Sequence, residues 1–129
     1  QGVRPGADAT VVAWGALGRE ALTAAEALEG DGIGVEVIDL RTLAPMDSDT
    51  VVASVRKTGR LVVAHEAPRT LGLGAELSAR VTEEALTALL APVERVTGYD
   101  TVMPLYRLEN HYLPDAARIE RGVRKVMAY

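Results

Sequence analysis

Polar side chains close two of the apolar segments of this chain. His65 and Glu66 end one segment and Arg69 follows shortly after, whereas Asp39 and Arg41 end another. Because histidine titrates near neutral pH, His65 beside a carboxylate suits general acid–base chemistry or a proton-responsive contact at an interface. The simpler interpretation is a histidine that fixes a strand–loop junction by hydrogen bonding. In either case, these five residues are candidates for a polar interface.

Two glycine motifs resemble cofactor-binding loops without completing them. Gly72 and Gly74 form Gly-x-Gly, but the dinucleotide fingerprint requires a third glycine where this chain has Leu77. We interpret the pair as a tight turn between a strand and a helix. Residues 30–32 (Gly-Asp-Gly) match the start of the thiamine diphosphate motif, which must end in Asn-Asn, but the only asparagine is Asn110. This triplet is also interpreted as a turn.

The cysteine, histidine and serine content gives no reason to predict a catalytic, cofactor-binding or metal-binding residue in this chain. The chain has no cysteine, which excludes disulfides, thiol nucleophiles and Cys-ligated zinc. His65 and His111 are far apart and lack metal-ligand spacing, and no Ser–His–Asp pattern is readable.

Composition indicates one globular domain over residues 1–129. Hydrophobic residues make up 48% and charged residues 25% of the 129 positions, which is close to the globular average. The net charge of −4 argues against nucleic-acid binding, and the apolar runs are too short to cross a bilayer. No secretory signal is visible, so we expect a cytoplasmic protein. The chain starts with Gln1, which predicts a piece of a longer protein, and its preference for arginine over lysine suggests a bacterial source.

The apolar pattern predicts the elements that position these residues. Short segments rich in β-branched residues alternate with segments of helical period. The predicted strands are 10–14, 35–40, 61–65 and a more polar edge strand 93–97, with a strand stub within 1–8. Helices are expected around 17–28, 73–88 and about 115–129. A further helix is expected around 51–55, after a start signal at residues 47–49 and before a stop at Gly59. Alternating strands and helices indicate an α/β fold, here a three-layer α/β/α sandwich with a mostly parallel sheet of four to five strands.

The last predicted helix carries a strip of basic residues. They are Arg118, Arg121, Arg124 and Lys125. A solvated face is the favoured interpretation, since cations complement the C-terminal end of a helix dipole. An acidic or polar partner is the alternative.

Several sequence motifs together resemble one family. They are VVAWG (11–15), EVIDLRTLAPMD (36–47), KTGRL (57–61), HEAP (65–68), GYDT (98–101) and YLPD (112–115). In this order they resemble the C-terminal, transketolase-type domain of the beta subunit of thiamine diphosphate-dependent 2-oxo acid dehydrogenases. The VAWG and GYDT segments are more similar to the branched-chain type than to the pyruvate type.

The resemblance implies an assembly role within an oxidoreductase. In that family the alpha subunit and the N-terminal domain of the beta subunit bind thiamine diphosphate and magnesium, so this domain alone is expected to bind neither and to be inactive. The domain packs with the alpha subunit and a second beta subunit, which predicts that Asp39, Arg41, His65, Glu66 and Arg69 lie at a subunit contact. It also implies that the stub within 1–8 is an antiparallel strand.

The resemblance further implies a docking site for the subunit-binding domain of the dihydrolipoyl acyltransferase core. That domain is basic, so Glu94, Asp100 and Tyr129 with the chain's terminal carboxylate are the predicted contacts. Two alternatives remain open. One is a free-standing small-ligand or nucleotide-binding α/β module, and the other is the same domain from transketolase or deoxyxylulose phosphate synthase.

Overall fold

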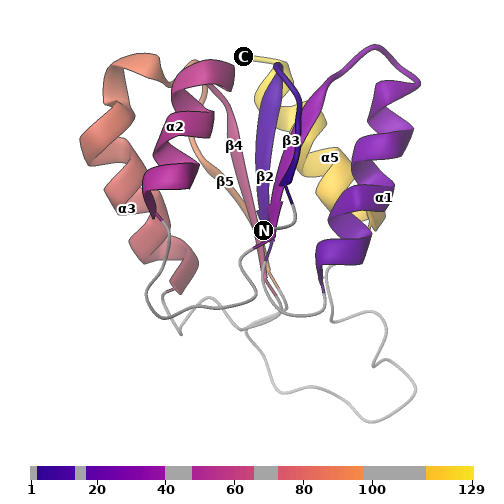
Figure 1. Cartoon of the computed structure of the whole chain (residues 1–129), viewed down its shortest axis with the longest axis horizontal. Helices are drawn as coiled ribbons and strands as arrows, with labels where there is room; N and C mark the ends of the chain where they lie inside the picture. The colour runs from indigo at the N-terminus through magenta and orange to yellow at the C-terminus, as the bar shows by residue number, and fades with distance from the viewer. Residues whose placement is uncertain (1–2, 14–16, 40–47, 66–72, 98–115) are drawn as a thin grey trace, which may run out of the picture.

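A computed structural model describes residues 3–13, 17–39, 48–65, 73–97 and 116–129. Figure 1 shows a central sheet with helices on both faces, which confirms the predicted three-layer α/β/α sandwich. The strands are β1 (Val3–Arg4), β2 (Ala9–Ala13), β3 (Val35–Asp39), β4 (Leu61–His65) and β5 (Glu94–Thr97). The helices are α1 (Gly18–Glu29), α2 (Ser48–Thr58), α3 (Leu73–Ala85), the 3₁₀ turn η3 (Leu86–Ala88) and α5 (Ala116–Met127).

The described strands form one sheet in the order β1-β3-β2-β4-β5. Strands β2 to β5 are parallel, and β1 pairs with β3 in the antiparallel direction. This confirms both the mostly parallel sheet and the antiparallel strand within residues 1–8. The more polar strand, β5, lies at an edge as predicted.

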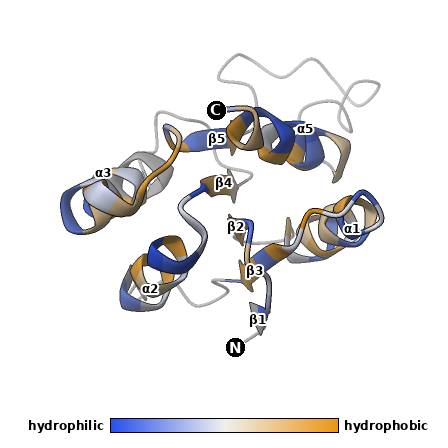
Figure 2. Ribbon diagram, turned by 90° about the horizontal axis from the view of Figure 1, so that it is seen from above, coloured by the Kyte–Doolittle hydropathy of each residue, from blue (hydrophilic) through white to orange (hydrophobic). Residues whose placement is uncertain are grey.

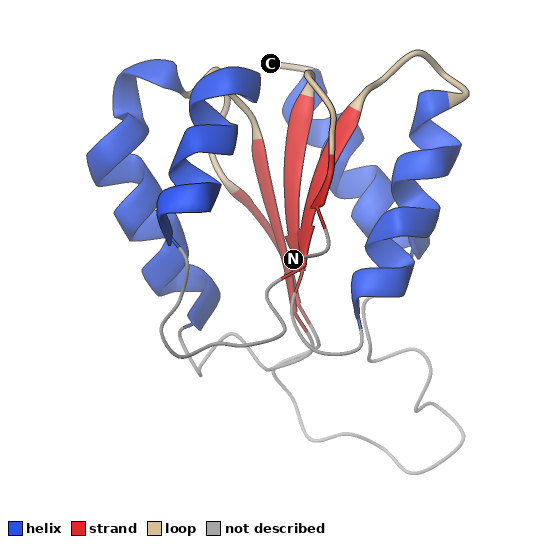
Figure 3. Cartoon of the chain, in the orientation of Figure 1, coloured by secondary structure: helices blue, strands red, loops and turns tan. Residues whose placement is uncertain are grey.

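The central strands are largely apolar on both sides, which suits a sheet whose two faces are both covered by helices (Figures 2 and 3). Val11 and Val37 contact the α1/α5 layer, whereas Val12 and Ile38 face the α2/α3 layer. This alternation follows from the two-residue period of a strand. It divides the core into two apolar clusters, one on each face of the sheet.

The observed element ends differ slightly from the expected ones. Helix α3 ends at Ala85, whose backbone leaves helical geometry (φ −134°, ψ 27°), and η3 continues the predicted apolar stripe to Ala88. Helix α2 ends where predicted, because Gly59 adopts a φ of +75° that favours glycine. Strand β2 starts at Ala9, one residue earlier than expected. Trp14, Leu40 and Asp115 lie outside the described residues.

Candidate functional site

The carboxyl ends of the parallel strands bring part of the predicted polar interface to one edge of the sheet. Asp39 ends β3 and His65 ends β4, with β2 between them. Adjacent strands lie about 4.8 Å apart, so roughly 10 Å separates the two main chains. Arg41, Glu66 and Arg69 lie outside the described residues.

The Asp39 carboxylate lies against the start of α1. A methyl group added to Gly18, the first residue of that helix, would lie 2.5 Å from Oδ2 of Asp39. Leu17 at the N-cap position offers no side-chain cap, so this carboxylate from the neighbouring strand supplies the negative charge that the helix end favours. The described part of the site therefore places Asp39 in a positioning role at the junction of β3 and α1.

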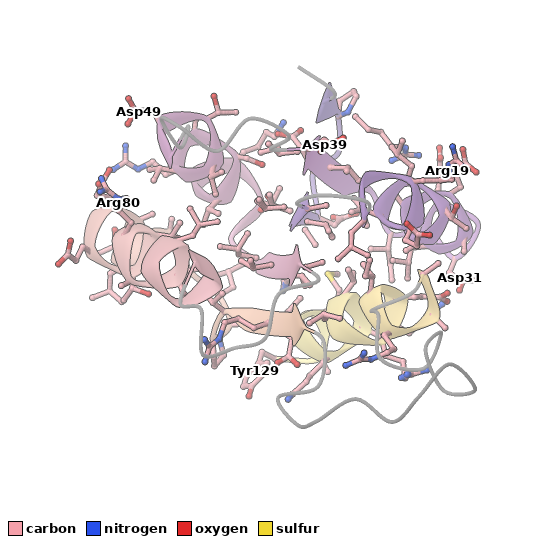
Figure 4. All side chains as sticks on the ribbon, turned by 90° about the horizontal axis from the view of Figure 1, so that it is seen from below. Arg19, Asp31, Asp39, Asp49, Arg80 and Tyr129 are labelled. Carbon is pink, nitrogen blue, oxygen red and sulfur yellow. The ribbon has the colours of Figure 1, made fainter. Side chains whose placement is uncertain are left out.

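The opposite, amino-terminal edge of the sheet gathers part of the predicted docking set. Lys125 Nζ on α5 lies 3.2 Å from Oε1 of Glu94 at the start of β5. Arg60 Nε donates a hydrogen bond of 3.2 Å to the carbonyl oxygen of Val126, which anchors the end of α5 beside β4. The C-terminus consequently lies next to β5 (Figure 2), and the Tyr129 side chain is 67% exposed there (Figure 4).

An exposed leucine adjoins this edge. Leu90 donates its backbone N–H to the carbonyl oxygen of Gly59 at 2.7 Å, yet 59% of the residue remains exposed. Glycine is required at position 59 by its φ and by space, since a methyl group there would meet the Leu90 side chain at 2.8 Å. We define the amino-end surface as Arg60, Leu90, Glu94, Lys125 and Tyr129. Asp100, the third predicted docking residue, lies outside the described residues.

Two residues of the basic strip on α5 are paired with acids of the same domain. Arg124 pairs with Asp31 and, at 3.0 Å, with Glu120, and Lys125 pairs with Glu94. These contacts support the interpretation of the strip as a solvated face. They also mean that Glu94 is already shared with a lysine.

The two glycine motifs are described to different extents. Residues 30–32 form the turn that follows α1, where Gly32 has a φ of +84° and Asp31 pairs with Arg124. Gly74 lies in the first turn of α3, and Gly72 lies outside the described residues. Within the described ranges, no three His, Asp or Glu side chains converge as metal ligands, and no helix is long and apolar enough to span a membrane.

One buried carboxylate was not predicted. The side chain of Glu36 is only 9% exposed, and its Oε1 lies 2.5 Å from Lys57 Nζ and accepts the backbone N–H of Gly6 at 3.0 Å. Burial raises the pKa of Glu36, but the hydrogen bonds from Lys57, Gly6 and Ser54 and the charge of Lys57 outweigh it, so the net pKa is lowered. The available signal was a glutamate inside the apolar segment 35–40. This group ties β3 to α2 and to the turn after β1.

The chain is similar to known proteins along nearly its whole length. Residues 1–119 match the family model described as transketolase, C-terminal domain. The chain is 52% identical over 127 residues to the pyruvate dehydrogenase E1 component subunit beta of Leifsonia xyli subsp. xyli, covering 98% of this chain and 38% of that protein. It is 47% identical over 128 residues to the mitochondrial 2-oxoisovalerate dehydrogenase subunit beta of Dictyostelium discoideum, covering 98% of this chain and 34% of that protein.

A solved structure shares this architecture. It is described as a split gene transketolase, inactive beta4 tetramer, and aligns with a TM-score of 0.82 and 34% identity over 97% of this chain and 40% of that chain. The chain thus spans less than half the length of the relatives that it matches. Because both pyruvate and 2-oxoisovalerate types are among them, the finer prediction of a branched-chain type is not resolved.

Proposed function

Because the chain belongs to the family of transketolase C-terminal domains, we propose that it is the assembly and docking domain of the beta subunit of a 2-oxo acid dehydrogenase. The complete enzyme would act as an oxidoreductase on pyruvate or a branched-chain 2-oxo acid in the cytoplasm of a bacterium. The similarity to beta subunits of both types supports this proposal. The observation that carries the docking role is the amino-end surface, which includes an exposed tyrosine, an exposed leucine and the carboxylate of Glu94.

The proposed partner at the amino-end surface is the subunit-binding domain of the dihydrolipoyl acyltransferase. The exposed rings and methyl groups of Tyr129 and Leu90 would supply apolar contact area. The carboxylate of Glu94 would receive basic side chains of the partner in charge-assisted hydrogen bonds. Lys125 would have to release Glu94 or share it, which favours partners that bring more than one positive charge.

The proposed role of the carboxyl-end residues is contact with the alpha subunit and a second beta subunit. Asp39, Arg41, His65, Glu66 and Arg69 follow strands at the edge where α/β sheets usually meet ligands and partners. Thiamine diphosphate and magnesium would be held by the other parts of the complete enzyme. In the full-length beta subunit, His65→Ala should therefore impair assembly with the alpha subunit, and unchanged assembly and activity would refute this role.

The docking proposal can be tested by titration calorimetry with the acyltransferase subunit-binding domain. Tyr129→Ser removes the exposed ring and should weaken binding by about 1–3 kcal/mol. Leu90→Ser should weaken it about tenfold. Leu22→Ser is the matched control, because Leu22 is also exposed but lies on α1. If both amino-end variants bind as the unaltered chain does, the surface is not the docking site.

A thermal-shift screen addresses the competing functions. A free-standing binding module would be stabilised by its nucleotide or small ligand, since a ligand that binds only the native state raises the melting temperature. We expect no shift with nucleotides or with thiamine diphosphate and magnesium for this domain alone. A clear shift would favour the free-standing module over the docking domain.

A further inference from the structure

The carboxylate of the amino-end surface is already bound by a lysine of the same domain. Lys125 Nζ on α5 lies 3.2 Å from Oε1 of Glu94 at the start of β5. The ion pair is in contact with solvent, since the side chain of Lys125 is 61% exposed and that of Glu94 is 27% exposed. A carboxylate that is neutralised by its own lysine attracts a basic partner less strongly than a free carboxylate does.

A structural role is the simpler interpretation of this ion pair, because it joins the end of α5 to the edge strand β5. Other contacts already hold α5 in that place, however. Its apolar side is fully buried through Ile119, Val123 and Val126. Arg60 Nε also donates its hydrogen bond to the carbonyl oxygen of Val126 at 3.2 Å. An exposed ion pair adds little stability to such packing, so α5 should keep its position without Lys125.

The two members of the pair depend on each other alone within the described residues. Neither Glu94 nor Lys125 has another ion-pair partner there. The neighbouring cation, Arg124, is held by Asp31 and, at 3.0 Å, by Glu120. Loss of the lysine charge should therefore leave the Glu94 carboxylate open instead of passing it to Arg124.

We propose that Lys125 is an internal competitor for the Glu94 carboxylate and restrains the docking of a basic partner at the amino-end surface. In the free domain the lysine occupies the carboxylate, so an incoming basic side chain must displace Lys125 or share Glu94 with it. Docking is then an exchange of one cation for another, and the ion pair that is lost offsets part of the one that forms. The inference rests on the proposed docking function, and it assigns that surface a residue that opposes binding.

An internal competitor and a contact residue respond to mutation with opposite signs. Truncating a residue that contacts the partner, such as Tyr129 or Leu90, weakens binding. Removing the charge of Lys125 instead frees Glu94 and takes away a cation that repels a basic partner, so binding should become tighter. A lysine that served only to hold α5 in place would not improve docking when it is lost. The sign of the change therefore separates the two roles.

Titration calorimetry of the 129-residue chain with the acyltransferase subunit-binding domain measures this sign. At low salt, Lys125→Gln should lower the dissociation constant about three- to tenfold, and the gain should shrink at high salt, which screens exposed charges. Arg121→Gln is the matched control, because Arg121 is exposed on the same helix and unpaired within the described residues. It removes an equal charge without touching Glu94, and it should change the dissociation constant less than about twofold.

The Glu94→Gln background shows whether the gain acts through this carboxylate. There, Lys125→Gln should improve binding no more than Arg121→Gln does, and circular dichroism melts would establish that each variant is folded. The competitor role is overturned if Lys125→Gln binds no more tightly than the unaltered chain, or if its full gain persists in the Glu94→Gln background. Absence of binding by every variant would overturn the docking proposal and this inference together. Normal binding by the unaltered chain without a gain from Lys125→Gln would overturn this inference alone.

Discussion

The two faces of the sheet are held to their helices by different kinds of contact. The α1/α5 face is packed with small and branched apolar residues, among them Ala21, Ala25 and Val123. The α2/α3 face has an apolar cluster too, but polar groups are buried within it. Thr10 Oγ1 on β2 shares hydrogen bonds with Ser54 Oγ at 2.7 Å and Thr58 Oγ1 at 2.8 Å on α2.

This difference shows two ways of fixing a helix on a sheet. Apolar packing is non-directional, so close fit must determine where α1 and α5 lie. Gly122 on α5 illustrates the fit, because an added methyl group would come within 3.1 Å of Val96 Cγ2. Hydrogen bonds are directional, so the hydroxyl cluster and the Glu36–Lys57 pair specify the position of α2 along β2 and β3. The first face should be sensitive to lost volume and the second to lost polar partners.

The largest effect is expected from a cavity on the α1/α5 face. Leu28 is completely buried on α1, and Leu28→Ala should lower the free energy of unfolding by about 2–5 kcal/mol. Urea denaturation followed by circular dichroism measures this change. Leu22→Ala on the exposed side of α1 is the control and should change stability by less than about 0.5 kcal/mol. A loss at Leu28 no greater than the control would show that this face does not depend on close packing.

A smaller effect is expected from removing the buried hydroxyl on the other face. Thr10→Val keeps the shape of the side chain but removes the hydrogen-bond partner of Ser54 and Thr58, which should cost about 1–3 kcal/mol. The exposed Thr23→Val serves as the control. Adding Ser54→Ala to Thr10→Val should cost less than the sum of the single changes, because the two side chains share one cluster. Strict additivity would contradict a coupled network.

The smallest effect is expected from Glu36, and it should depend on pH. Because the pKa of Glu36 is lowered in the folded state, its ionised form stabilises the protein at neutral pH. That contribution is present above the ordinary glutamate pKa and is lost as the pH falls through the lower folded value. Glu36→Gln should therefore be less stable than the unaltered chain at pH 7, by about 1 kcal/mol given the exposure of Lys57.

The unaltered chain and the Glu36→Gln variant should become similar in stability as the solution is acidified. Urea denaturation at pH 7 and near pH 3 measures the difference, with Glu26→Gln as an exposed control on α1. A difference that is independent of pH would mean that the charge on Glu36 contributes nothing and only its shape matters.

The sequence predicted the elements well because each carries a local pattern. The buried runs of β2 and β4 and the stop at Gly59 are local features, and they were sufficient to predict the three-layer fold. The nearness of Tyr129 to Glu94 was not predictable, because it depends on how α5 returns along β5 after eighteen intervening positions outside the described residues. Thr10 gave no signal either. Threonine is ordinary in a strand, and its partners lie 44 and 48 residues later.

The interface candidates also show that local sequence patterns do not predict which distant residues come together. Polar residues at strand ends were recognised from the sequence. Two of them, Asp39 and His65, end strands β3 and β4 at the same edge of the sheet, with β2 between them. The exposure of Leu86 and Leu90 was not anticipated, because a leucine beside an apolar stripe gives no local signal of whether it is covered.

The strand order also sets a sequence of events during synthesis. Among the described residues, the apolar cluster of the α2/α3 layer uses none beyond Val93, so it can form while later residues are still being made. The α1/α5 layer also needs Ile119, Val123 and Val126, so the part of α1 that packs against α5 stays uncovered until these residues have been made. At the usual rate of roughly 5–20 residues per second, that interval lasts a few seconds. During this interval, the nascent domain presents an alanine-rich surface to chaperones. A polypeptide truncated before α5 would leave that surface exposed permanently.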